Sequence, residues 1–256
     1  MTARLGRMFL TGIASGAILA TVTLFASNSA NAEELATAAA SSLEEESFGQ
    51  NVDAAHIAIT SAPPTGQVLA MTRTPTGELI PLGGYALDLN GPAQPNGNTN
   101  ETATPYLIDF NQWVSCFSLN NEGEVFASYS HPYNGGRQDV RLKCGNSTWG
   151  YKHIRLNHEA DWQEKYNTAR DRGWNPELQG MNGWDDLMAE GAGNAIRFWT
   201  YAGPVSNNTK CTVGELVFVE WNGSTWTIVY EFRAVAAFAT NSDKLISTYP
   251  TRHATC

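Results

Sequence analysis

The sequence predicts an α+β fold, in which two helices are followed by an antiparallel β-meander and preceded by additional short strands. Two observations favour this fold. Apolar residues recur at helical spacing in two adjacent segments between residues 153 and 199. Apolar and polar residues then alternate, with turn signals between the runs, from residue 214 to residue 251. Helices followed by a run of strands are typical of an α+β domain.

Residues 1–32 have the pattern of a secretory signal peptide. Arg4 and Arg7 precede a mostly apolar run of 18 residues, Met8–Phe25, and small residues at 30–32 predict cleavage after Ala32. The alternative is an uncleaved membrane anchor, because 18 residues are borderline for spanning a bilayer. We expect a secreted, extracellular protein with no membrane association after cleavage.

Residues 33–55 are expected to form a mobile leader or propeptide. They contain no basic residue and too little apolar surface to offset the entropy of ordering the chain. The acidic residues are Glu33, Glu34, Glu44, Glu45, Glu46 and Asp53. Residues 56–104 then read as a short β-rich extension and linker, with strands at 56–60, 66–74 and 77–87 and a Gly-, Pro- and Asn-rich end.

Residues 105–256 are predicted to form the α+β domain. The first part, with strands at 106–120, 124–133 and 137–144, is followed by a helix that ends at Gly173. Ile154, His158, Trp162 and Tyr166 recur every four residues and define one face of this helix.

The second helix is predicted over residues 183–199, where two acidic residues suit the positive N-terminal end. The meander follows, with a hairpin over 214–232 that turns at Asn222-Gly223 and further strands at 234–240 and 244–251.

The charge of the chain argues against a general nucleic-acid-binding surface. Without the two basic residues of the signal peptide and the six acids of the leader, 14 basic and 19 acidic residues remain, a net charge of −5. The balance reverses over residues 137–158, which hold one acid, Asp139, and five bases: Arg137, Arg141, Lys143, Lys152 and Arg155. This window is either a solvated face or part of a binding site.

The four cysteines of an exported chain predict two disulfides, for which three pairings are possible. We favour Cys116–Cys144 and Cys211–Cys256, whose members are neighbours in sequence order. A zinc site is disfavoured because no pair of cysteines has C-x-x-C spacing.

His153 and His158 lie in the basic window, five residues apart. That spacing rotates the second side chain by roughly 140° around a helix, so a shared metal ion is not expected. Two readings remain for each residue: a surface position or a proton carrier for His153, and a core position or a supporting role in a site for His158.

The stretch "WGYKHIRLNHEADW", the helical pair, "LVFVEWNGSTWTIVYEF" and the terminal "LISTYPT" together resemble metal-independent ribonuclease toxin domains of bacteria, the barnase-, EndoU- and RNase A-like group. The resemblance covers about residues 144–251. It places an "HI…H" element before a β-meander whose last strand carries a "T-x-Y-P" type motif, with Ser247 here at the position that is usually threonine.

The resemblance implies a catalytic set and an RNA substrate. The set is His153, His158, Arg155, Ser247, Thr248 and Tyr249, with Lys152, Arg141 and Lys143 as substrate-binding residues. Arg155 is the nearest candidate for the phosphate, with Arg170 and Arg172 as alternatives. Histidine titrates near neutral pH and can carry a proton to or from RNA, while an arginine matches the charge of the phosphate.

The expected reaction is attack by a 2′-hydroxyl that leaves a 2′,3′-cyclic phosphate and a 5′-hydroxyl, without a metal or other cofactor. An immunity or inhibitor protein is an expected partner of such a toxin. Two other classes stay open: a secreted carbohydrate- or ligand-binding module, because the chain has eight Trp and nine Tyr, and a toxin that cleaves NAD or transfers ADP-ribose.

Overall fold

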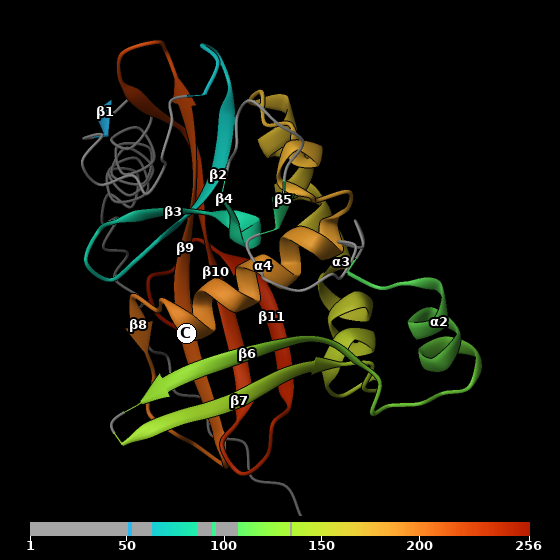
Figure 1. The fold of residues 1–256 in the computed structure, drawn as a ribbon. Helices are drawn as coiled ribbons and strands as arrows, with labels where there is room; N and C mark the ends of the chain where they lie inside the picture. Colours follow the sequence, from blue (N-terminus) through green and yellow to red (C-terminus); the bar gives the residue numbers. More distant parts are fainter. Residues whose placement is uncertain (1–50, 53–62, 87–93, 96–106, 134) are drawn as a thin grey trace, which may run out of the picture. The chain divides into compact units, whose positions relative to one another are not determined.

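The structure, a computed structural model, describes residues 51–52, 63–86, 94–95, 107–133 and 135–256 (Figure 1). The predicted signal peptide, nearly all of the leader, the predicted strand at 56–60 and most of the linker lie outside these residues. The α+β fold class is confirmed, because helices combine with sheets whose strand pairs are all antiparallel. Within the described ranges, no helix has the length and apolar character needed to cross a bilayer.

The main sheet contains the predicted meander. Strand β9 (Thr209–Trp221) pairs with β10 (Trp226–Ala239), and β10 pairs with β11 (Leu245–Thr251). The hairpin loop spans residues 222–225, because Trp221 pairs with Trp226, so it is longer than the two residues expected. Residues 234–239 continue β10 and do not form a strand of their own.

Two short strands from the region predicted to be an extension belong to this same sheet. Strand β2 (Val68–Arg73) pairs with β9 along its whole length, and β3 (Leu79–Pro81) pairs with β2. The sheet is completed by β1 (Asn51–Val52) beside β10 and β8 (Tyr201–Ala202) beside β9. The first described strands are therefore part of the domain's core.

Both predicted helices form and cover one face of the sheet (Figure 1). Helix α3 (Gly150–Asp171) buries Ile154, Trp162 and Tyr166, and α4 (Trp184–Arg197) buries most of its residues from Asp186 to Ile196. Helix α4 lies so close to β9 that a Cβ on Gly214 would come within 2.8 Å of backbone atoms of Ala195. Glycine is needed there because of this close approach.

The opposite face of the sheet carries a second, smaller apolar cluster. Along β2, Val68 and Ala70 contact the helix-side core, whereas Leu69 and Met71 belong to the second cluster. Strand alternation explains this division, because successive side chains point to opposite faces. Both faces of β2 and β9 are therefore apolar.

The segment at 106–120, predicted as a strand, is instead helical. Helix α2 (Phe110–Trp113) continues into the π-helical turn η3 (Val114–Ser118). Aromatic and β-branched residues suggested a strand, but Asp109 accepts from the Gln112 amide and Gln112 accepts from the Asp109 amide, a reciprocal cap that starts a helix. The hairpin of β6 (Val125–Tyr133) and β7 (Gly136–Lys143) follows as predicted.

The two predicted disulfides, Cys116–Cys144 and Cys211–Cys256, are both present. The first joins η3 to the residue that follows β7, and the second joins β9 to the last residue of the chain. Short elements complete the fold: η2 (Leu82–Gly84), β4 (Tyr85–Ala86), β5 (Gln94–Pro95) and η4 (Pro176–Gln179).

Several polar side chains are buried in this core, among them the titratable residues His131 and Asp186. His131, on β6, donates from Nδ1 to the Ile196 carbonyl at 2.9 Å and is packed between aromatic rings of Trp199 and Phe238. Its burial lowers the pKa of the imidazole. Asp186, at the start of α4, is also buried and accepts three backbone N–H bonds, from Leu107, Asn182 and Gly183.

Candidate active site

The loop before α3 places His153 at the surface. The helix begins at Gly150, three residues before the predicted start, where φ is +77° and a Cβ would lie 2.7 Å from the Lys143 carbonyl oxygen. A glycine at 150 thus lets the chain fold back tightly between β7 and α3. The turn brings the Ser147 carbonyl to 2.9 Å from Nδ1 of His153.

Two groups contact Nδ1 of His153: the Ser147 carbonyl at 2.9 Å, which can only accept, and the Asn157 side-chain nitrogen at 3.1 Å, which can only donate. The shorter contact favours the tautomer with the proton on Nδ1, in which Nε2 of the neutral ring has the free lone pair. Asn157, one turn further along, donates from Nδ2 to the His153 carbonyl at 2.8 Å. The half-buried imidazole is therefore held by its Nδ1 side, and Nε2 can accept a proton.

His158 lies beside His153 in spite of the 140° rotation, which follows from 3.6 residues per turn. The two ring centroids are 6.2 Å apart, with an interplanar angle of 79°. His158 also stacks on Tyr249 of β11, at a centroid distance of 5.0 Å, and its Nδ1 lies 3.3 Å from Asp161 Oδ2. The reading of His158 as a core residue is wrong, because its side chain is 24% exposed. Helix α3 runs along β11, the edge strand of the sheet, so the side chain of His158 is partly exposed to solvent.

Only one residue of the terminal motif reaches the histidines. Tyr249 does so by stacking, whereas Thr248 is fully buried and donates from Oγ1 to the Val235 carbonyl at 2.7 Å. The Thr248 carbonyl accepts from Nε1 of Trp162 at 3.2 Å, which ties β11 to α3. Ser247 is buried, and its hydroxyl has no hydrogen-bond partner within the part of the chain that is described. The expected contacts of Ser247 and Thr248 with phosphate do not fit these positions.

Arg155 and Lys152 lie on another side of α3. Arg155 is two positions after His153, which corresponds to a rotation of about 200° around the helix. Arg155 pairs with Glu159 at 3.2 Å, and its guanidinium lies over the Phe117 ring. Lys152 lies over the same ring and donates to Asn120 Oδ1 at 2.7 Å. Neither residue therefore accompanies the two histidines.

Arg141 and Lys143 are paired with an acidic residue that the basic window did not include. Asp243, in the β10–β11 loop, contacts Lys143 at 2.8 Å and Arg141 at 3.3 Å. The hydrogen bond from Lys143 lowers the pKa of Asp243, and both positive charges add to the effect. The positive charge predicted for this part of the surface is therefore partly neutralised.

Two residues at the N-terminal end of α3, Trp149 and Lys244, were not among the predicted site residues. Trp149 is the N-cap of α3, and the ammonium of Lys244 lies over its ring, 4.2 Å from the centroid. Nothing in the sequence indicated Trp149, because as the N-cap it has an extended backbone and does not continue the helical face that carries His153. Nothing in the sequence indicated Lys244 either, since only the pairing of β10 with β11 brings the loop between these strands to α3.

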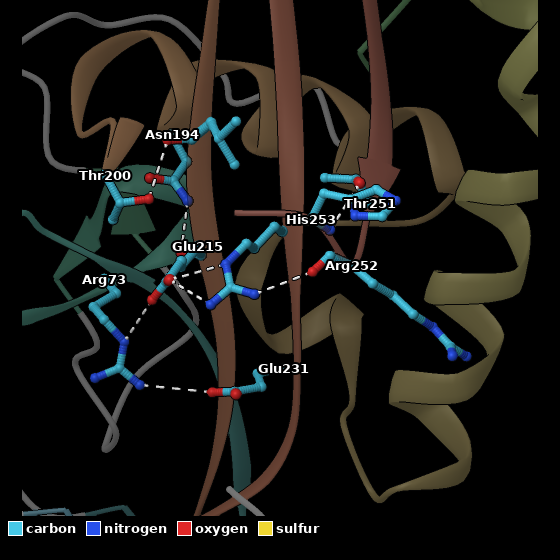
Figure 2. A network of polar contacts seen from close by, with 10 residues as sticks. Arg73, Asn194, Thr200, Glu215, Glu231, Thr251, Arg252 and His253 are labelled. Carbon is cyan, nitrogen blue, oxygen red and sulfur yellow. Dashed lines mark hydrogen bonds and ion pairs between the residues drawn. The ribbon is translucent and has the colours of Figure 1, made fainter. Parts of the chain in front are cut away.

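A second polar cluster, on β2, β9 and β10, connects two arginines with two glutamates. Figure 2 shows Arg73 reaching both Glu215 and Glu231, at 3.1 and 3.7 Å. Arg233 contacts Glu215 at 3.0 Å. The charges balance, and the four side chains come from paired rows of adjacent strands. This network joins strands and offers no unpaired charge to a ligand.

A hollow of about 770 Å³ lies at the other end of α3, lined by polar residues that include Tyr166, Arg170, Asp171 and Glu177. Arg170, one alternative for the phosphate, lies over the Tyr166 ring there. No histidine lines the hollow. Across the described ranges, no three His, Cys, Asp or Glu side chains are grouped closely enough to hold a metal ion.

Comparisons with known proteins give no further identification. No protein-family model, no curated protein and no solved structure matches this chain. The candidate site is thus defined by its geometry: His153, His158 and Tyr249 at the junction of α3 and β11, with the Trp149–Lys244 pair at the N-terminal end of the same helix.

Proposed function

We propose that this protein is a secreted endoribonuclease that cleaves RNA without a metal ion. The observation that carries the proposal is the pair of accessible imidazoles, whose centroids are 6.2 Å apart. Cleavage by a 2′-hydroxyl needs one group that removes a proton and another that supplies one, and two adjacent histidines can do both. The resemblance to ribonuclease toxin domains, on the same residues, is a separate line of support.

The hydrogen bonds suggest a role for each histidine. Nε2 of His153, with Nδ1 committed to the Ser147 carbonyl, is the general base that takes the 2′-hydroxyl proton. The 2′ oxygen bonds to phosphorus, the bond from phosphorus to the 5′ oxygen breaks, and His158 gives its proton to that oxygen. The products are a 2′,3′-cyclic phosphate and a 5′-hydroxyl.

Tyr249 positions the general acid. Its ring stacks on His158 with an interplanar angle of 30°, and an aromatic face stabilises a cation above it. Asp161 holds the same imidazole through Nδ1. Both contacts leave Nε2 of His158 for the leaving group.

The arrangement of the tryptophans disfavours a carbohydrate-binding module. Such a module needs several exposed rings, but Trp162, Trp174 and Trp226 are buried in the two apolar clusters, and among the eight tryptophans only Trp113, at 47%, is largely exposed. The site at α3 and β11 instead gathers groups that transfer protons.

The test is incubation of the purified mature protein with a single-stranded RNA oligonucleotide in excess EDTA. We expect cleavage to fragments that end in a 2′,3′-cyclic phosphate and begin with a 5′-hydroxyl, identified by mass spectrometry. An oligonucleotide with 2′-deoxyribose at every position should stay intact, because it has no internal nucleophile. The proposal is wrong if EDTA stops the cleavage or if the DNA oligonucleotide is cut equally fast.

A further inference from the structure

The site described so far has two proton carriers but no cation for the phosphate. Transfer at phosphorus places negative charge on the phosphate oxygens, and a fixed positive group there is usually a large contributor to catalysis. Arg155 is paired with Glu159 on another side of α3, and Arg141 and Lys143 are paired with Asp243. The cation must therefore come from elsewhere.

Lys152 is directed to Phe117 and Asn120 on another side of α3, which leaves Lys244, at the N-terminal end of the helix, as the candidate. The Lys244 ammonium lies 4.2 Å from the centroid of Trp149. No carboxylate of the described chain forms an ion pair with it, although its neighbour Asp243 pairs with two other bases. An unpaired ammonium held on an aromatic ring keeps its charge available for a ligand.

The turn before α3 connects Trp149 to His153. The Asn146 amide donates to the Trp149 carbonyl at 2.9 Å, and Ser147, inside the same turn, presents its carbonyl to Nδ1 of His153 at 2.9 Å. A lysine has a flexible stem of four carbons, so the Lys244 ammonium can move from the Trp149 ring toward a ligand bound at His153. The N-terminal end of α3 adds positive potential at the same place.

We infer that Lys244 binds the phosphate of a single-stranded RNA substrate at the His153–His158 site, and that Trp149 positions it there. This inference rests on the proposed ribonuclease activity. Lys244 then takes the place of Arg155, Arg141 and Lys143 as the residue that contacts the phosphate. It also explains why a domain with a net negative charge can bind an anionic substrate, since the charge is supplied locally.

The experiment measures kcat/KM for an RNA oligonucleotide at several salt concentrations. Lys244→Gln should lower kcat/KM by about 10- to 100-fold, the usual effect of losing a hydrogen bond between charged groups. The slope of log(kcat/KM) against log[salt] should become shallower by about 0.7, the value for one phosphate contact on a single strand. Lys244→Arg should keep the slope of the parent.

Arg137→Gln is the matched control. It removes one positive charge from an exposed position at the far end of the β6–β7 hairpin and should leave the slope unchanged. If the parent cuts RNA and Lys244→Gln keeps its salt slope and rate, the inference about Lys244 is wrong while the ribonuclease activity stands. If the parent does not cut RNA, the proposed function fails and this inference fails with it.

Discussion

The imidazole of His158 stacks on the phenol ring of Tyr249, with centroids 5.0 Å apart. This contact joins the middle of α3 to the last strand of the meander. If the ring is what positions His158, Tyr249→Phe should reduce cleavage only slightly, whereas Tyr249→Leu should reduce it strongly. The measurement is kcat/KM for both variants. Equal losses in the two variants would show that the hydroxyl, not the ring, is what matters.

His153→Ala should abolish most of the activity without unfolding the protein. Removing a general base costs about 10²- to 10⁴-fold in rate. The side chain is half-buried and hydrogen-bonded at the surface, so its loss opens no core cavity. Single-turnover cleavage and thermal melting check the two halves of this prediction.

His158→Ala is the variant to compare with His153→Ala. It should lower both activity and stability, because it also removes the stacking on Tyr249, worth about 0.5–1.5 kcal/mol for an aromatic pair. A His153→Ala protein that cuts RNA as fast as the parent would rule out the assignment of the base.

His131 should make the protein less stable in acid. Burial lowers the pKa of its imidazole below the usual 6.5, so the folded state prefers the neutral ring. Its contribution to stability is therefore fully present above pH 6.5 and is lost as the pH falls through the folded-state pKa. His131→Phe should lose less stability than the parent between pH 7 and pH 5, as measured by urea unfolding. His253→Ala, at an exposed position after β11, should behave like the parent.

Asp186 should have the opposite effect on the pH dependence of stability. Burial raises the pKa of its carboxyl from 3.8 to about 6, so the folded state prefers the protonated form. The contribution is fully present below pH 3.8 and is lost as the pH rises to about 6. In Asp186→Ala this part of the pH dependence should be lost, while the part from Asp185 and Glu190, whose pKa values burial also raises, remains. The unfolding free energy should also fall by roughly 1–3 kcal/mol, because three buried N–H groups lose their acceptor. An unchanged pH profile between 3.8 and 6 would contradict the assignment to Asp186.

No thiol should react in the denatured, unreduced protein, because all four cysteines are in the two disulfides. The loops they close have sequence separations of 28 and 45, so each bridge should contribute roughly 3–4 kcal/mol in the chain-entropy model. Thiol titration in guanidinium checks the number of free cysteines. Cys211→Ala with Cys256→Ala checks the contribution of the second bridge.

Much of the fold could be predicted because its signals are local. The four-residue recurrence from Ile154 to Tyr166 gave α3, and the alternation after Gly214 gave β9 and β10. The helical segment at Phe110–Ser118 was missed, because its aromatic and β-branched residues suit a strand and its cap depends on two side chains. The place of β2 beside β9 could not be foreseen, since that pairing joins residues far apart in the sequence.

The site was predictable only in part, for a related reason. The sequence named His153, His158 and Tyr249, which the structure brings together. The resemblance to ribonuclease toxin domains also placed Ser247 and Thr248 in the catalytic set, although both side chains are buried. Strand alternation alone does not show which side of an edge strand a neighbouring helix covers. The ion pairs of Arg141 and Lys143 depend on Asp243, which is about 100 residues away in the chain.

The Cys116–Cys144 bridge bears on where the proposed ribonuclease would be active. Cys144 is directly followed by the turn that presents the Ser147 carbonyl to His153, and its own carbonyl accepts from the Lys152 amide. In a reducing cytoplasm the bridge does not form, so this turn lacks its covalent link to the neighbouring helical segment. If the proposed ribonuclease is exported before it oxidises, its precursor inside the producing cell lacks this support for His153, and the RNA of that cell is spared.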